Sequence, residues 1–287
     1  MVSLRDIRRK IKSVKSIQQI TKAMKMVAAA RLRKAQSRIL SARPFAQGME
    51  GLMTDLLQRL GNPDQHPLIC KREGTQRALL LVTSDKGLCG AFNTNLIREA
   101  LRYAKTHGLP NVHFFIVGRK GRDYFKRHGV TLRKEYVNIF NNLSFAHAEI
   151  VTQDLLEAYE KQPFVQVDML YNEFKSAIFQ KVTIKPLLPM ASVASVPREP
   201  HWPDFIFEPA QEKLLDGLIR RFLKAQVYRV LLESNAAELG ARMSAMDNAT
   251  RNASDLMESL TLRLNRTRQA FITKEILEVV SGAEALK

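Results

Sequence analysis

Cysteine is scarce in this chain of 287 residues, and two cysteines, Cys70 and Cys89, exclude a disulfide framework. Two reduced thiols are the simpler interpretation, and a single bridge stays open. Long apolar runs are also missing, because no stretch approaches the roughly 18–20 consecutive apolar residues that span a bilayer. The first forty residues contain no unbroken apolar core, which excludes a secretory signal peptide. Apolar residues still make up 45% of the sequence and charged residues 25%, as in soluble proteins.

Proline is absent from both ends of the chain. All 11 prolines lie between Pro44 and Pro209. A proline in a helix interior costs about 3 kcal/mol, so the two proline-free ends permit long helices. The proline-bearing middle is typical of a separate globular unit. We therefore expect three parts, with helices over residues 1–58 and 209–287 and a domain over residues 75–200.

Acidic residues are nearly absent from the first 43 residues, where Asp6 is the single acid among 13 lysines and arginines. This segment therefore carries a net charge of +12 out of +17 for the whole chain. Such a segment favours an acidic partner, which is nucleic acid, anionic lipid or an acidic protein surface. Nucleic acid is the weaker alternative, because the segment contains no aromatic side chain on which bases could stack.

Apolar residues recur at helical spacing in both end segments. Steps of three and four residues predict one apolar stripe on the N-terminal helix, formed by Leu4, Ile7, Ile11, Val14, Ile17, Ile20, Met24 and Val27. Heptad steps continue in the C-terminal segment at Met257, Leu260, Leu264, Thr267 and Phe271. Both segments also contain zones of small residues, which allow two helices to approach closely. The pattern predicts an antiparallel two-helix coiled coil, closed by the middle domain.

The two helices differ in length, so one must extend beyond the other. If pairing begins at the middle domain, residue 1 lies opposite about residue 264, and roughly 20 residues, or about 30 Å of helix, project. That segment contains Phe271, Ile272, Ile276, Leu277 and other apolar side chains. An unpartnered helix of this kind predicts a socket in another protein. The alternative is that the tip folds back or frays.

Strands and helices alternate in the middle of the chain. Buried strands are expected at residues 77–83 and 112–117, a third at 130–139, and helices at about 93–106 and 144–161. Residues 164–174 and 180–188 are expected to form a hairpin. This alternation predicts a small, mostly parallel, Rossmann-like α/β domain inserted between the two long helices. The fold class is therefore α/β plus long helices.

The middle domain lacks the motifs of a nucleotide site or a hydrolase. There is no G-x-G-x-x-G, no G-x-x-x-x-G-K-[ST] and no G-x-S-x-G. The six histidines have no metal-ligand spacing. The Gly87–Gly90 loop is either a tight strand-to-helix turn or a weak anion site, and Asp85 and Lys86 are interpreted as structural or capping residues. No catalytic residue, metal or cofactor is predicted, although an α/β enzyme with a helical appendage stays open as an alternative.

Several motifs then resemble one family along the whole chain. Residues 20–28 (Ile-Thr-Lys-Ala-Met-Lys-Met-Val-Ala), 33–36, 83–90 and 205–209 resemble, in order, segments of the gamma subunit of F-type ATP synthases. Residues 265–275 (Asn-Arg-Thr-Arg-Gln-Ala-Phe-Ile-Thr-Lys-Glu) and 278–283 resemble its C-terminal signature, the most specific of these matches. The resemblance implies a non-catalytic rotor shaft. It turns inside a ring of alpha and beta subunits, binds the epsilon subunit and the membrane ring of c subunits, and regulates ATPase activity and proton flow.

The resemblance also implies roles for individual residues. Contacts with the beta subunit are implied for two groups, which are Arg268, Gln269 and Thr273 at the catch loop, and Met24, Lys22 and Lys25 at the acidic loop. Contacts near the c ring and epsilon are implied for Phe205, Phe207 and Glu208. Phenylalanine stands where many members have tyrosine, which puts hydroxyl-mediated contacts there in doubt.

Two features expected of organellar members are missing. The redox-regulatory cysteine insert of chloroplast members is absent, and the family motif begins at once, without a presequence. We therefore expect a bacterial-type protein, peripheral on the cytoplasmic face of the plasma membrane and without direct membrane insertion.

Overall fold

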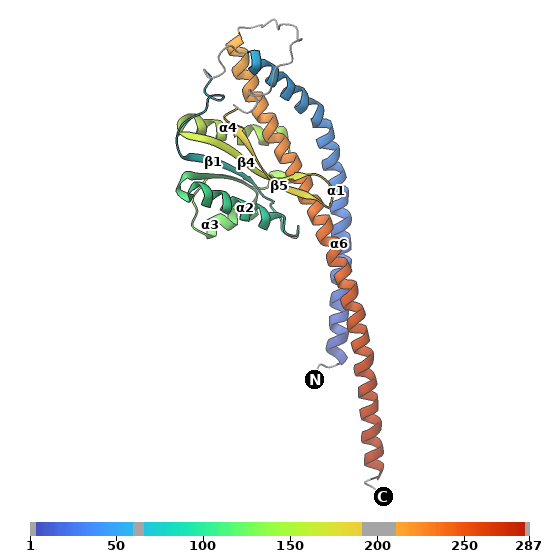
Figure 1. Ribbon diagram of the computed structural model, residues 1–287. Helices are drawn as coiled ribbons and strands as arrows, with labels where there is room; N and C mark the ends of the chain where they lie inside the picture. Colours follow the sequence, from blue (N-terminus) through green and yellow to red (C-terminus); the bar gives the residue numbers. More distant parts are fainter. Residues whose placement is uncertain (1–3, 60–65, 191–210, 285–287) are drawn as a thin grey trace. The chain divides into compact units, whose positions relative to one another are not determined.

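The computed structural model describes residues 4–59, 66–190 and 211–284 (Figure 1). Two helices, α1 (Leu4–Arg59) and α6 (Gln211–Glu284), form the ends of the chain. This confirms the two predicted long helices to within a few residues. The chain divides into two compact units. One contains the residues up to Ala28 and from Met243 onward, and the other contains Ala29–Arg242.

A five-stranded sheet forms the centre of the Ala29–Arg242 unit. Its strand order is β3-β2-β1-β4-β5, and only β5 is antiparallel to its neighbour. This confirms the predicted mostly parallel α/β domain and the hairpin at its end. Its elements are β1 (Gln76–Val82), α2 (Phe92–His107), η2 (Leu109–Asn111), β2 (Val112–Val117), α3 (Arg119–Arg127), β3 (Leu132–Tyr136), η3 (Ile139–Asn141), α4 (Phe145–Lys161), β4 (Phe164–Phe174) and β5 (Gln180–Leu188).

The central strand β1 is apolar without interruption because both faces of the sheet are covered. Leu79 and Leu81 lie in a core shared with α2 and α3, while Leu80 and Val82 lie in a second core shared with α4 and the long helices. Figure 1 shows α2 and α3 on one side of the sheet and α4 on the other. All four of these β1 side chains are fully buried, which explains the strand-sized apolar run in the sequence.

The small residues of α6 have a second role that the sequence pattern did not predict. Ala236 and Ala237 are fully buried, and a Cβ added to Gly240 would lie 2.9 Å from the carbonyl oxygen of Ala177 in the β4–β5 turn. The zone of small residues therefore lets the sheet domain approach α6, as well as letting helices approach one another. Ala28 and Ala35 of α1 are also buried, each within its own unit.

Candidate functional site

Polar as well as apolar side chains join α1 to α6 in the unit formed by the chain ends, where Ile7 and Met246 are buried. Three contacts set the pairing: Gln18 Nε2 donates to Ser254 Oγ at 2.7 Å, Thr250 Oγ1 donates to Thr21 Oγ1 at 2.8 Å, and Lys25 Nζ donates to Asp247 Oδ1 at 2.5 Å. The α6 number falls as the α1 number rises, which confirms antiparallel pairing.

The register differs from the expectation by about one heptad. Extending these contacts by equal steps places Leu4 opposite about residue 268. The expected pairing of residue 1 with about residue 264 corresponds to Leu4 opposite about residue 261, which is seven residues away. The expectation assumed that both helices begin to pair at the same level. The polar partners instead decide which residues lie opposite one another, and they shorten the projecting segment.

Beyond Val14 the predicted apolar stripe of α1 is wrong at three positions, and it is confirmed only at Met24, which is half-buried. Ile17, Ile20 and Val27 are 50%, 59% and 53% exposed, whereas Thr21 and Ala28 are buried. The face of α1 that contacts α6 is therefore shifted by one residue toward the C-terminus from the predicted stripe. Two stripes of neighbouring positions compete here, and the inward one is chosen because its polar groups satisfy one another across the seam and its alanine allows close approach. Hydrophobicity by itself favours the other stripe.

The Lys25–Asp247 pair gives one of the predicted partner residues a role inside the chain. The hydrogen bond from the Lys25 ammonium, supported by nearby Arg251, lowers the pKa of the Asp247 carboxyl below its usual range. Lys22 is exposed and Met24 is half-buried beside this pair. Of the three, Lys22 is the one whose side chain is free to meet another molecule without breaking a contact between helices.

The charge on Asp247 should make the pairing of the helices depend on pH. Because its pKa is lower in the folded chain, the stabilisation is present above the carboxyl's unfolded pKa and is lost as the pH falls through the folded value. We expect Lys25→Met to lower the melting temperature of the full-length chain slightly at pH 7, since the pair is partly exposed. Far-UV circular dichroism should show this difference shrinking between pH 7 and a strongly acidic pH. Lys22→Met is the matched control and should melt like the unchanged chain at both pH values; an equal effect of the two variants would contradict this role for Lys25.

The projecting end of α6 is present as predicted. Leu264 and Thr267 are the last half-buried positions of the seam, and every residue from Arg268 to Ser281 is exposed. Exposed apolar side chains in this stretch are Phe271, Ile272, Ile276, Leu277, Val279 and Val280. The helix continues to Glu284, so the tip does not fray within the described residues. An apolar surface of this kind marks a contact with another protein.

The three predicted catch-loop positions lie where the seam ends. Arg268, Gln269 and Thr273 are all exposed on α6. The Thr273 hydroxyl donates to the Gln269 carbonyl oxygen at 3.0 Å, a bond within the helix, and Arg268 has no ion pair among the residues that the structure describes. The predicted positions Phe205, Phe207 and Glu208 lie outside the described residues.

The loop after β1 is held by its own side chains. Asp85 Oδ1 accepts the backbone N–H groups of Arg119, at 3.1 Å, and Asn138, at 2.9 Å, so one carboxylate joins the loops that follow β1, β2 and β3. This confirms the structural interpretation of Asp85. The Asn93 amide donates to the Ser84 hydroxyl at 2.8 Å and accepts the Ser84 N–H at 3.0 Å, which supports a tight turn.

An ion pair that the sequence pattern did not predict connects this loop to α6. Arg242 Nη2 donates to Glu238 Oε1 at 2.6 Å and to the carbonyl oxygen of Gly87 at 3.2 Å. Burial raises the pKa of the Glu238 carboxyl, although Arg242 opposes this shift, and burial together with Glu238 raises the pKa of the Cys89 thiol. The spacing of Glu238 and Arg242, four residues apart on a helix, was the available signal.

Comparisons with known proteins agree along the full length. The family described as ATP synthase matches residues 3–286. The ATP synthase gamma chain of Heliobacterium modesticaldum is 44% identical over 293 residues, and that of Anaeromyxobacter sp. (strain Fw109-5) is 45% identical over 297 residues, with all of both chains covered in each case.

Solved structures share the fold. A chain of the Tetrahymena thermophila mitochondrial ATP synthase central stalk and c ring is 32% identical, with a TM-score of 0.64, covering 80% of this chain and 99% of that one. A chain of the Euglena gracilis mitochondrial ATP synthase is 22% identical, with a TM-score of 0.70, covering 99% of this chain and 94% of that one. The Euglena likeness shows the fold alone.

Proposed function

Because this chain belongs to the ATP synthase gamma chain family, we propose that its exposed helix surfaces transmit torque through contacts that change as it turns. It is the central stalk rotor of an F-type ATP synthase, a non-catalytic subunit of a complex that couples proton transport to ATP synthesis. A rigid shaft does such work by binding its chemically identical neighbours unequally, because each unequal contact biases the state of that neighbour. Because the chain belongs to this family, we set aside the two alternative functions, a nucleic-acid-binding protein and an α/β enzyme.

The tip of α6 is the observation that carries this proposal. Its residues from Arg268 to Ser281 are exposed in the isolated chain, and large apolar side chains recur along them. The tip acts as a bearing in a socket formed by the alpha and beta subunits. Arg268, Gln269 and Thr273 lie at the base of the tip, where the seam ends. They bind the catch loop of beta and select particular rotor angles.

A second contact with beta lies on α1. The acidic loop of beta binds near Lys22 and Met24, and the exposed apolar side chains of Ile17, Ile20 and Val27 face the same surrounding ring. Lys25 supports this surface from within by holding Asp247. Many weak contacts of exposed charges suit a rotating part, because each is worth only about 0–1 kcal/mol and can be exchanged.

At its other end the chain binds the epsilon subunit and the c ring. The Tetrahymena relative is part of a central stalk with a c ring, which supports this proposal. Phe205, Phe207 and Glu208 are the residues proposed for it. The proposal also keeps three functional parts, which are shaft helices over residues 1–58 and 209–287 and the domain over residues 75–200.

The protein is placed peripherally, on the cytoplasmic face of a bacterial plasma membrane. None of the described helices has the length and apolar character needed to cross a bilayer. The curated relatives named above are bacterial, which supports this location.

Purification of the assembled complex tests the proposal. The full-length chain with an affinity tag at its N-terminus, expressed in its own host and extracted in mild detergent, should bring down alpha, beta, epsilon and c subunits in fixed ratio. Residual contaminants are recognised by a parallel purification with the untagged chain. Recovery of the tagged chain without alpha and beta would contradict the proposal.

Met24→Lys is expected to uncouple the motor more than it slows it. The new cation joins Lys22 opposite an acidic loop, and a tighter contact at one rotor angle impedes further rotation. ATP-driven proton pumping should therefore fall more than the ATPase rate of the same vesicles. Met26→Lys makes the same change at a position 60% exposed on a different face of α1, and it should pump normally. Equal losses of pumping and hydrolysis in Met24→Lys would count against this mechanism.

A further inference from the structure

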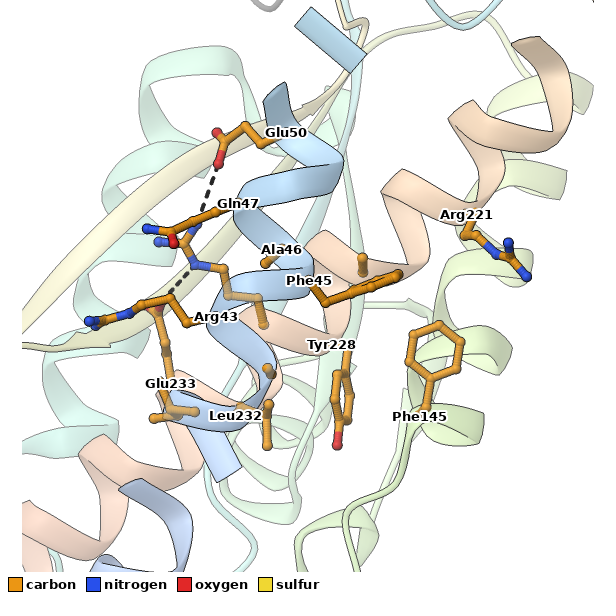
Figure 2. Close-up of a pocket in the computed structure, with 14 residues that line it drawn as sticks. Arg43, Phe45, Ala46, Gln47, Glu50, Phe145, Arg221, Tyr228, Leu232 and Glu233 are labelled. Atoms are coloured by element: carbon orange, nitrogen blue, oxygen red, sulfur yellow. Dashed lines mark hydrogen bonds and ion pairs between the residues drawn. The ribbon is translucent and has the colours of Figure 1, made fainter. Parts of the chain in front are cut away.

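A cavity of about 710 Å³ lies between α1 and α6 within the Ala29–Arg242 unit (Figure 2). Its walls are formed by residues 39–50 of α1, residues 221–233 of α6 and Phe145 at the start of α4. Cavities that bind small molecules typically have volumes of about 300–1,000 Å³ and mostly apolar walls. Neither the rotor function nor the contacts proposed above use this cavity.

The space exists because alanines line it where larger side chains would fill it. Ala42, Ala46 and Ala225 line the walls, and Ala46 and Ala225 are buried. Around them stand three aromatic rings, those of Phe45, Phe145 and Tyr228, and Figure 2 shows them turned toward the space between the helices. Phe145 and Tyr228 meet edge to face with their ring centres 5.5 Å apart. A flat aromatic molecule suits walls of this kind.

The charged side chains of the cavity leave an excess of positive charge. Arg229 lies between the two carboxylates, with its Nε 2.9 Å from Glu233 Oε1 and its Nη1 3.8 Å from Glu50 Oε2. One guanidinium therefore occupies both acids, as the dashed lines of Figure 2 show. The other two arginines of the walls, Arg43 and Arg221, are exposed and have no ion pair among the described residues. These guanidinium groups are available to an anion.

One acceptor in the wall lacks a donor. Glu233 is only 8% exposed, and although its Oε1 accepts from Arg229, its Oε2 is buried with no hydrogen-bond partner in the described chain. An unsatisfied buried carboxylate oxygen is costly, and an N–H or O–H group of a bound molecule satisfies it once the Glu233 side chain turns toward the cavity. Glu233 therefore requires a hydrogen-bond donor on the ligand, and the two arginines without ion pairs require an anionic group on the same ligand.

We infer that the cavity is a binding site for a small aromatic organic anion that also carries a hydrogen-bond donor. The aromatic body packs against Phe45, Phe145 and Tyr228. The anionic group binds Arg221 or Arg43 at the mouth, and the donor binds Glu233. A ligand bound in the cavity contacts both α1 and α6, where the small alanine side chains leave the two helices without contact. The bound ligand therefore stiffens the shaft.

Two fluorescent probes that differ in one group test the charge of the ligand. The full-length chain is titrated with 8-anilino-1-naphthalenesulfonate and with N-phenyl-1-naphthylamine, which keeps the rings and the N–H but lacks the sulfonate. Arg221→Gln should weaken the saturable binding of the sulfonate about three- to fivefold, as expected for an exposed charge, and leave the neutral probe unchanged. Arg98→Gln, an exposed arginine on α2, is the matched control. Equal effects of Arg221→Gln on both probes would overturn the proposal.

A cavity-filling variant tests the location, because both probes also bind exposed apolar surfaces such as the tip of α6. Ala42→Trp places a large side chain into the cavity and should remove one saturable probe site per chain. Ala23→Trp makes the same change at an exposed position of α1 and should keep that site. Far-UV circular dichroism checks that each variant is folded, and Arg221→Gln tests the proposal independently if Ala42→Trp is not.

The assembled ATP synthase decides between a small ligand and a protein occupant. If the cavity serves a small anion, the complex keeps the Arg221-dependent probe site that the isolated chain has. Loss of that site on assembly would show that a neighbouring subunit fills the cavity, and it would overturn the proposal. Retention of the probe site by Ala42→Trp would do the same.

Discussion

A chain truncated after Leu264 is expected to lose most of its torque and coupled ATP synthesis in a reconstituted complex, whereas a chain truncated after Ser281 keeps both. The first truncation removes Arg268, Gln269 and Thr273 together with all the exposed apolar residues of the tip. It removes about 30 Å of helix, and with it the end of the shaft that is proposed to turn in the socket of the ring. The second removes only residues 282–287 and leaves every proposed contact in place.

ATP-driven proton pumping and single-molecule torque on reconstituted complexes measure this difference. Some rotation should persist after the Leu264 truncation, because α1 and the remaining seam keep the contacts proposed for them, but synthesis against a proton gradient requires full torque. Arg268→Leu should fall between the two truncations, since it keeps the apolar tip and deletes one charged contact. Arg263→Leu, at an exposed position two residues before the signature segment 265–275, controls for the change of charge on α6. Normal pumping and synthesis by the Leu264 truncation would show that the tip is not a functional bearing.

Gly118→Ala is expected to destabilise the sheet domain by about 3–5 kcal/mol, the largest effect of any single substitution proposed for the fold. Gly118 has a φ of +93°, and a Cβ added there would lie 2.2 Å from the carbonyl oxygen of Thr83. With φ +93° and ψ 144° the backbone lies in a region that is essentially restricted to glycine and costs a side chain about 1–3 kcal/mol, and the clash adds the cost of moving two strand ends that meet at this point. Thr83 cannot yield, because its hydroxyl donates to the Val117 carbonyl oxygen and accepts the Gly121 N–H, both at 2.9 Å.

Gly129→Ala is the comparison variant, because it has the cost of a positive φ without the clash. Its φ of +70° is also positive, but a Cβ there would have nothing within 4 Å, so only the backbone term of about 1–2 kcal/mol applies. Urea unfolding should be followed by near-UV circular dichroism of tyrosine, because all six tyrosines lie between residues 103 and 228, within the Ala29–Arg242 unit. A cost for Gly118→Ala no greater than that for Gly129→Ala would show that the close approach to Thr83 is not a constraint.

The sequence by itself determined the architecture and the family of this protein. Absence of proline from the first 43 and last 78 residues and heptad spacing predicted two long helices, although α1 also continues through Pro44, and apolar runs between turns predicted the buried parallel strands. These features are local, because helix and strand periodicity depend on neighbouring residues. The existence of a projecting tip followed from the same arithmetic, since it depends on the lengths of two helices, whereas the length of the tip depends on the register that their contacts set. The order of specific motifs identified the family.

Tertiary structure alone decided which faces meet. On α1 it exposes Ile17, Ile20 and Val27 and buries Thr21 and Ala28, because polar partners on α6 satisfy one another across the seam. A single helix does not reveal such partners, which lie more than 200 residues away in sequence. The same is true of the cavity between α1 and α6, where alanines that look unremarkable in sequence leave space because rings from three separate helices surround them. Pairing, register and empty volume are properties of two surfaces in contact, and periodicity describes only one of them.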